Sequence, residues 1–244
     1  MITILQWTTL AVCGIVALAR IPSALRGENR SLFFIYAFMT VAILLSMDAP
    51  YLAIDRFLGG TNLANLLLRF IIFGAIFALG IRVARGFGAD GALNLITGRI
   101  GIAVLGAASV VVVAVFLMMD TAGSSAGLVA VFAKNDRNAA LVEYYGAAGR
   151  LYPAYVTLAL LPAMVRTAAS GLPRLVRLSA AMLAVGAVAI SLSLLSPVIP
   201  ASLGFLRFVF SYTAILCLVL GLALIWLGKT VAKRTPKTQT GFNR

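Results

Sequence analysis

Charged and amide side chains interrupt the apolar runs of this sequence, and their types suit the binding of an anion. Arg69 lies inside "NLANLLLRFIIFGAIFALG" at residues 62–80, a run that is otherwise almost entirely hydrocarbon. Asn62, Asn65 and Arg69 are spaced three and four residues apart, which places them on one face of a helix. A stripe of amides and a guanidinium facing lipid would be costly. We therefore expect this stripe to face other helices or water.

A second polar stretch follows later in the chain, in "EYYGAAGRLYPAY" at residues 143–155. Glu143 and Arg150 are seven residues apart, two helical turns along one face, and Tyr145 and Tyr152 have the same spacing. These side chains can line a polar cavity together with the first stripe. For the tyrosines, an aromatic belt at the membrane interface is the alternative.

A carboxylate partner is expected for Arg69, because a charge near the centre of a bilayer costs about 2.5–3.5 kcal/mol on insertion scales. Glu143 is the leading candidate, and Asp48, at the outer end of a predicted helix, is the alternative. Asp55 and Arg56 are expected outside the bilayer. A simpler interpretation, in which Arg69 extends toward the outer surface, also stays open. The residues of the predicted outward-facing cavity are Asn62, Asn65, Arg69, Glu143, Arg150, Asp48, Tyr145 and Tyr152.

The composition requires a membrane around these residues. Of the 244 residues, 62% are hydrophobic and only 11% are charged, whereas a soluble domain has about 25% charged residues. So few charges cannot cover a globular surface. A net charge of +13 would indicate nucleic acid in a soluble protein. Here the basic residues separate apolar runs, as is typical of loops beside an anionic leaflet, so we expect the lipid bilayer as partner and no nucleic acid.

A helix that crosses the bilayer needs about 20 apolar residues, and seven runs approach this length. The predicted fold class is an all-α membrane protein, a bundle of seven transmembrane helices within residues 1–228. A short basic tail at 229–244 is expected to be disordered. The predicted spans are residues 2–19, 32–52, 63–81, 100–119, 140–165, 178–198 and 208–228.

Lysine and arginine residues gather in alternate connections between these spans. The sequence has 20 of them, and 14 lie after the first, third, fifth and seventh spans. Three others, Arg56, Lys134 and Arg137, lie in the remaining connections. Because short cytoplasmic loops carry an excess of Lys and Arg, we expect the N-terminus outside and the C-terminus inside the plasma membrane of a bacterium.

Most enzyme classes are excluded by what the sequence lacks. It contains no histidine, and its two cysteines, Cys13 and Cys217, lie in apolar runs. This argues against histidine-based haem or zinc sites and against serine–histidine catalysis. No P-loop motif occurs, and the loops are too short for a kinase or nucleotide-binding domain. We therefore expect no catalytic residue, no cofactor and no metal.

Three segments, "IDRFLGGTNLANLLLRF", "YYGAAGRLYPAYV" and "LPRLVRLSAAMLAVGAV", resemble the membrane region of a family of actinobacterial multi-pass proteins. Members of that family are labelled as transporters or integral membrane proteins, without an established activity. The resemblance extends over nearly the whole chain, and none of its motifs is catalytic. Longer members carry a cytoplasmic domain after the last helix. This sequence does not include that domain, which argues against signalling through an output domain of its own.

Two functions fit these observations. One is a ligand-binding, sensor-like module that binds a small molecule and acts through a separate cytoplasmic or membrane protein. The other is a secondary transporter of a small solute, anionic in view of Arg69 and Arg150, with prolines in the later spans supplying the broken helices that transporters use. A similarity between residues 67–73 and 205–211 would fit an internal repeat. The sequence alone does not separate the two functions.

Overall fold

The computed structural model describes residues 2–27 and 30–200, together with single positions between 203 and 224. Its described residues are helical without any strand, which confirms the all-α class. The long helices are α1 (Ile2–Leu25), α2 (Arg30–Leu45), α4 (Leu63–Gly86), α6 (Arg99–Met118), α8 (Asp136–Ala168) and α9 (Arg174–Leu192). The short ones are α3 (Asp48–Phe57), α5 (Asp90–Thr97), η1 (Ala126–Leu128), α7 (Val129–Phe132) and η2 (Ser193–Val198).

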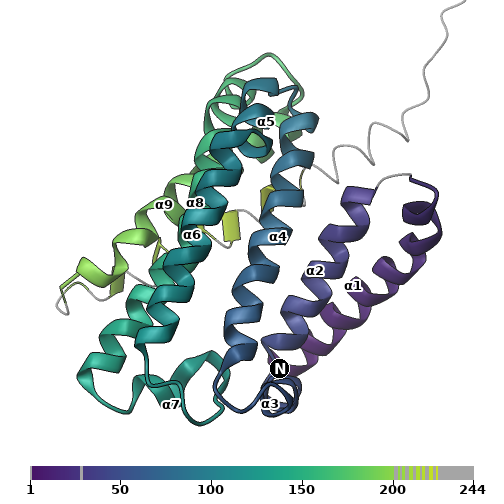
Figure 1. Ribbon diagram of the computed structural model, residues 1–244. Helices are drawn as coiled ribbons and strands as arrows, with labels where there is room; N and C mark the ends of the chain where they lie inside the picture. The colour runs from purple at the N-terminus through teal and green to yellow at the C-terminus, as the bar shows by residue number, and fades with distance from the viewer. Residues whose placement is uncertain are drawn as a thin grey trace, which may run out of the picture.

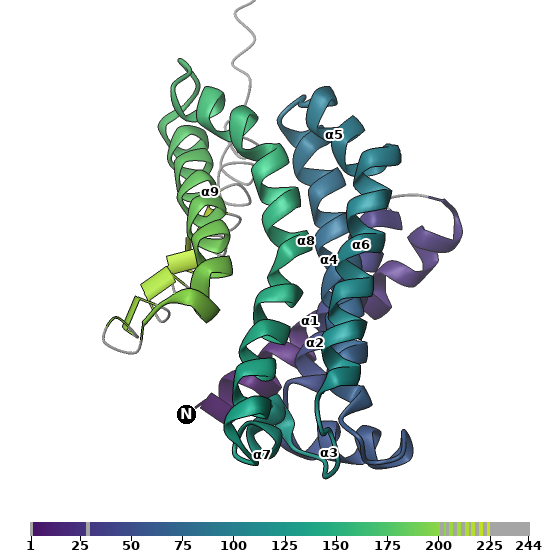
Figure 2. The same cartoon turned by 60° about the vertical axis from the view of Figure 1, so that its left-hand side comes forward.

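The long helices run up and down between two ends of the molecule (Figure 1). One end, called the α3/α7 end, holds the two short helices α3 and α7 together with the N-terminus. The other, called the α5 end, holds the short helix between α4 and α6. In the centre, α8 packs against α4 and α6. The α1–α2 hairpin joins this centre through contacts of α2 with α4, and α9 packs on α8 (Figure 2).

A membrane-crossing role is plausible for three of these helices, which are both long and apolar enough. They are Leu63–Gly86, Arg99–Met118 and the continuous run Arg174–Val198. A fourth crossing is added if the bent pair formed by Phe33–Leu45 and Asp48–Phe57 is one span. Among the residues that the structure describes, then, three or four helices meet these criteria. The prediction of helices at 63–81, 100–119 and 178–198 is confirmed: the first ends five residues later, the second is shifted by one residue, and the third begins four residues earlier.

The predicted span 32–52 is not one straight helix, because the chain turns sharply between α2 and α3. The axes of the two helices differ by 91°, and Met47 between them is extended, with φ −96° and ψ 135°. Pro50 explains the break. Inside a continuous helix it would remove one hydrogen bond and clash with the carbonyl of Ser46, whereas the first turn of a new helix accepts it. Asp48 then lies in that first turn, where the helix dipole favours a negative charge.

The predicted span 140–165 lies within α8, which is a single helix of 33 residues despite Pro153 and Pro162. At 1.5 Å per residue it is about 50 Å long, more than the thickness of the hydrocarbon core. Side chains are small where it meets α4: a Cβ added to Gly80 would lie 2.6 Å from Val156 Cγ1. The span predicted at 208–228 and the tail at 229–244 fall outside the continuously described residues.

Candidate polar site

Asp55 is fully buried within the α3/α7 end of the protein. Its Oδ2 accepts hydrogen bonds from the backbone N–H of Asn62 at 3.0 Å and from the hydroxyl of Ser124. Its Oδ1 accepts one from the N–H of Ala64, also at 3.0 Å. These donors belong to the first turn of α4 and to the loop before α7. The carboxylate therefore stabilises the N-terminus of α4, where the helix dipole favours a negative charge.

Asn62 holds three segments together at the same place. It precedes α4 in the left-handed conformation, with φ 58° and ψ 22°, which asparagine tolerates better than most residues. Its Oδ1 accepts from the hydroxyl of Tyr51 at 2.9 Å and from the N–H of Ser125 at 3.0 Å. Its Nδ2 donates to the carbonyls of Thr121 at 2.9 Å and Gly123 at 2.8 Å. Asn62 is thus a structural residue, and the predicted stripe with Asn65 and Arg69 begins only at Asn65.

Arg69 lies in the contact between α4 and α8. Its Cζ is 5.0 Å from the centroid of the Tyr145 ring, a distance that allows a cation–π interaction. Its side chain crosses α8 at Gly149, where an added Cβ would be 2.8 Å from Nη1 and 2.9 Å from Cδ. Only glycine leaves room for the arginine there. The guanidinium is therefore seated on a surface made by one tyrosine ring and one glycine.

Arg150, the next residue of α8, points toward the end of α9. Its Nη1 donates to the carbonyl of Ser193 at 3.0 Å and to the hydroxyl of Ser196 at 2.8 Å. Both acceptors belong to η2, the segment in which the helix tightens after Leu192. Arg150 also lies within electrostatic reach of Arg69, and the interaction is unfavourable because both groups are cations. Two positive charges thus share one partly buried region.

Several buried polar atoms around the two arginines lack a hydrogen-bond partner among the described residues. They are Asn65 Oδ1, Arg69 Nε, Tyr145 OH and Tyr152 OH, with Asn138 Nδ2 at the start of α8. Asn65 is 5% exposed, and the two tyrosines are fully buried. Folded proteins leave few buried polar atoms without a hydrogen-bond partner, and each such atom costs about 1–3 kcal/mol of stability. We call Asn65, Arg69, Tyr145, Arg150 and Tyr152 the α4–α8 polar cluster.

Tyr145 and Tyr152 do not belong to an aromatic belt at the membrane surface, because their rings lie inside the molecule. Tyr145 lies 5.9 Å from the ring of Phe116 in α6. Tyr152 lies 5.5 Å from Phe73 in α4 and 6.3 Å from Tyr155. These aromatic contacts join α4, α6 and α8.

The structure brings five of the eight predicted residues into this region and places three elsewhere or differently. Asp48 is exposed in the first turn of α3. Asn62 serves the loop contacts already described. Glu143 is partly buried two turns before Arg150 on α8, and it takes part in an interaction of its own. The predicted ion pair of Arg69 with Glu143 or Asp48 does not occur, since Lys134–Asp120 is the ion pair formed within the described residues.

The sequence reasoning missed Tyr51 and the burial of Asp55 at the α3/α7 end. Tyr51 and Asp55 are buried on one face of α3, four residues apart. Gly59 and Gly60, with φ of 101° and 69°, make the turn that returns the chain to Asp55, so that the N–H of Gly60 donates to the Asp55 carbonyl. The glycine pair after an amphipathic segment was the available signal, because it predicts a tight turn at that point.

The loop between α6 and α8 is closed by a surface ion pair. Lys134 Nζ lies 2.9 Å from Asp120 Oδ1 and also donates to the Asp120 carbonyl at 3.1 Å. The hydrogen bond from this ammonium lowers the pKa of the Asp120 carboxyl. A lowered pKa stabilises the fold above the ordinary value for aspartate, and the effect is lost as the pH falls through the folded value. The pair is exposed, so we expect this effect to be small.

Comparison of the chain with family models, curated proteins and solved structures gives no match. The chemistry of the site therefore has to be argued from its own residues. Two guanidiniums, two phenol hydroxyls and one amide offer mainly hydrogen-bond donors and positive charge. Such a set suits a small anion with oxygen acceptors, such as a carboxylate or a phosphate.

Proposed function

We propose that this chain is a multi-pass membrane protein that binds a small anion at the α4–α8 polar cluster and acts as a sensor-like module through a separate protein. The observation that carries the proposal is the pair of arginines on α8 and α4. Arg69 makes no ion pair with a described carboxylate and leaves Nε unpaired, while Arg150 repels it. An anion between them would offset the repulsion and satisfy the free donors, in surroundings where charge interactions are strong.

This function is tested by the effect of anions on the purified protein. A panel of small carboxylates and inorganic phosphate would be added in detergent, and the melting temperature followed as a function of concentration. At least one anion is expected to stabilise the protein in a saturable way, because a ligand that binds only the folded state raises its stability. Replacement of Arg69 by glutamine should raise the apparent dissociation constant about tenfold, since one charge-assisted hydrogen bond is lost.

The matched control is Arg137→Gln, which removes an exposed arginine at the start of α8. It should leave the stabilisation unchanged at the same ionic strength. If Arg137→Gln and Arg69→Gln weakened the effect equally, the anions would be acting on the general positive charge of the protein. If no anion gave a saturable effect, a binding site at the cluster would be ruled out for these ligands.

The proposal includes seven spans with the N-terminus outside and the C-terminus inside. Support comes from the alternation of basic residues and from the arrangement in Figure 1, where the helix ends that carry Arg85, Arg99 and Arg166 belong to the α5 end. A reporter fused after Arg244 is expected in the cytoplasm. One inserted beside Lys134, in the loop before α8, is expected outside. Finding the loop reporter in the cytoplasm would contradict this orientation.

A second candidate is secondary transport of a small anion, and the contact of Arg150 with η2 favours it. At this contact the helix α9 continues as the tighter 3₁₀ helix η2. A carbonyl and a hydroxyl of η2 accept hydrogen bonds from the guanidinium of Arg150. Discontinuous helices at the substrate site are common in secondary transporters. Uptake of a stabilising anion into proteoliposomes would favour transport. Saturable binding without uptake would favour the sensor-like module.

A further inference from the structure

The hairpin of α1 and α2 encloses an apolar hollow at the α5 end, far along the helices from the polar cluster. Its volume is about 350 Å³. The lining residues are Ile21, Ala24, Leu25, Arg30, Phe33 and Phe34. Two of the apolar side chains are also open to the surroundings, since Leu25 is 79% exposed and Phe34 is 47% exposed. In a membrane protein such a surface meets hydrocarbon, so the hollow is suited to part of an acyl chain.

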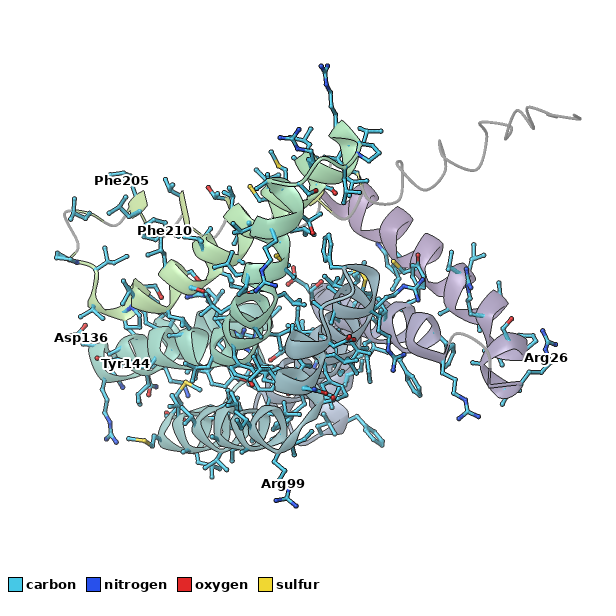
Figure 3. The ribbon with its side chains drawn as sticks, turned by 90° about the horizontal axis from the view of Figure 1, so that it is seen from above. Arg26, Arg99, Asp136, Tyr144, Phe205 and Phe210 are labelled. Atoms are coloured by element: carbon cyan, nitrogen blue, oxygen red, sulfur yellow. The ribbon has the colours of Figure 1, made fainter. Side chains whose placement is uncertain are left out.

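A guanidinium stands at the edge of this apolar hollow. Arg30 Nε donates to the Ala24 carbonyl at 3.2 Å, which folds the Arg30 side chain back over the end of α1. Arg26, two residues after Ala24, is exposed, and Figure 3 shows its side chain directed away from the helices. Residues 20–30 contain three arginines and one glutamate, so this end of the hairpin is positively charged. The charge complements a phospholipid head with net negative charge, and it favours less a head whose phosphate is balanced by a cation.

We propose that the α1–α2 hairpin holds one anionic phospholipid, with an acyl chain in the hollow and the phosphate on Arg30. The two parts of the site match the two parts of such a molecule. Five apolar side chains line the space for the acyl chain. Because the Nε of Arg30 is already bonded, the two terminal amino groups of its guanidinium are left for the phosphate oxygens. Arginine is suited to this role because its fork matches phosphate geometry. A free phosphate would use Arg30 but not the hollow.

The test compares two lipids with the same acyl chains on the purified full-length protein. Phosphatidylglycerol and phosphatidylcholine would be titrated in detergent, and the bound lipid counted by native mass spectrometry. The wild-type protein is expected to keep one phosphatidylglycerol at a concentration roughly fivefold lower than it needs for phosphatidylcholine, since one arginine near an anionic group contributes about that factor. Arg30→Gln should remove this preference, and Arg30→Lys, which keeps the charge, should retain most of it.

Two further variants separate a lipid site from general attraction by positive charge. Ala24→Phe places a ring in the hollow and leaves every charge in place, so it should weaken the binding of both lipids. Arg99→Gln removes an exposed arginine at the same end, which Figure 3 shows pointing away from the helices at the start of α6, and it should change nothing. Melting temperatures would confirm that each variant is folded.

Three results would overturn the proposal. One is an equal loss of lipid preference in Arg99→Gln and Arg30→Gln, which would assign the effect to overall charge. Another is unchanged lipid binding by folded Ala24→Phe, which would show that the hollow is not used. The third is displacement of the bound lipid by glycerol phosphate at similar concentration, which would reduce the site to a phosphate site without a chain.

Discussion

Replacement of Asn62 by alanine is expected to lower the stability of the protein more than any other single change at the α3/α7 end. The side chain makes four hydrogen bonds, to Tyr51, Thr121, Gly123 and Ser125. Alanine leaves these partners unpaired in a place where little water reaches them, at a cost of about 3 kcal/mol. For a chain of this length the melting temperature should fall by roughly 6–12 °C. Thermal unfolding in detergent measures the change.

Two comparisons separate the causes of this loss. Asn62→Gly removes the same hydrogen bonds but fits the left-handed backbone, so it should be about 1 kcal/mol less harmful than Asn62→Ala. Asn94→Ala changes an exposed asparagine in α5 and should stay within about 0.5 kcal/mol of the wild type. Equal effects of Asn62→Ala and Asn94→Ala would mean that the cluster around Asn62 does not stabilise the fold.

The second large effect is expected from Gly149→Leu, because Arg69 occupies the space that the new side chain needs. A Cβ at residue 149 would already lie 2.8 Å from Arg69 Nη1, closer than carbon and nitrogen atoms can pack. The arginine must leave its place over Tyr145, and the variant should lose about 3 kcal/mol of stability. It should also lose the stabilisation by anions that we expect of the wild type. Both quantities can be read from thermal unfolding with and without the anion.

A double-mutant cycle tests the reason for this effect. Arg69→Ala vacates the space, so Gly149→Leu in that background should cost at least 1 kcal/mol less than it does alone. A conservative change five residues further along α8, Ala154→Gly, serves as a control for disturbance of α8 and should show no such coupling with Arg69→Ala. Additive losses for Gly149→Leu and Arg69→Ala would show that the arginine does not rest on Gly149 in the folded protein.

The positions of the long helices could be predicted because their signal is local. Runs of apolar residues bounded by arginines locate α4, α6 and α9 to within a few residues, and Arg69 was expected to face helices. The break before α3 was harder to place. The sequence shows Pro50, but the choice between a kinked span and a new helix across the end of the bundle depends on what the new helix packs against.

The parts of the candidate site that the sequence did not show depend on contacts between distant residues. Asp55 is buried because Ser124, 69 positions later, and the start of α4 supply its donors. An ion pair was expected for Arg69 because charge attracts charge. Instead, the Arg69 side chain packs on the ring of Tyr145 and on Gly149. The spacing of residues within one helix does not indicate which residue of another helix will lie opposite.

The early end of α2 has a consequence for the bilayer itself. The helix has 16 residues, about 24 Å at 1.5 Å per residue, which is less than the hydrocarbon thickness of about 30 Å. A short helix is accommodated by local thinning of the membrane or by a neighbouring segment at the interface. Here α3 leaves at nearly a right angle, with Phe57 at its end 90% exposed. If α2 crosses the bilayer, we therefore expect lipids with shorter acyl chains to surround this edge preferentially.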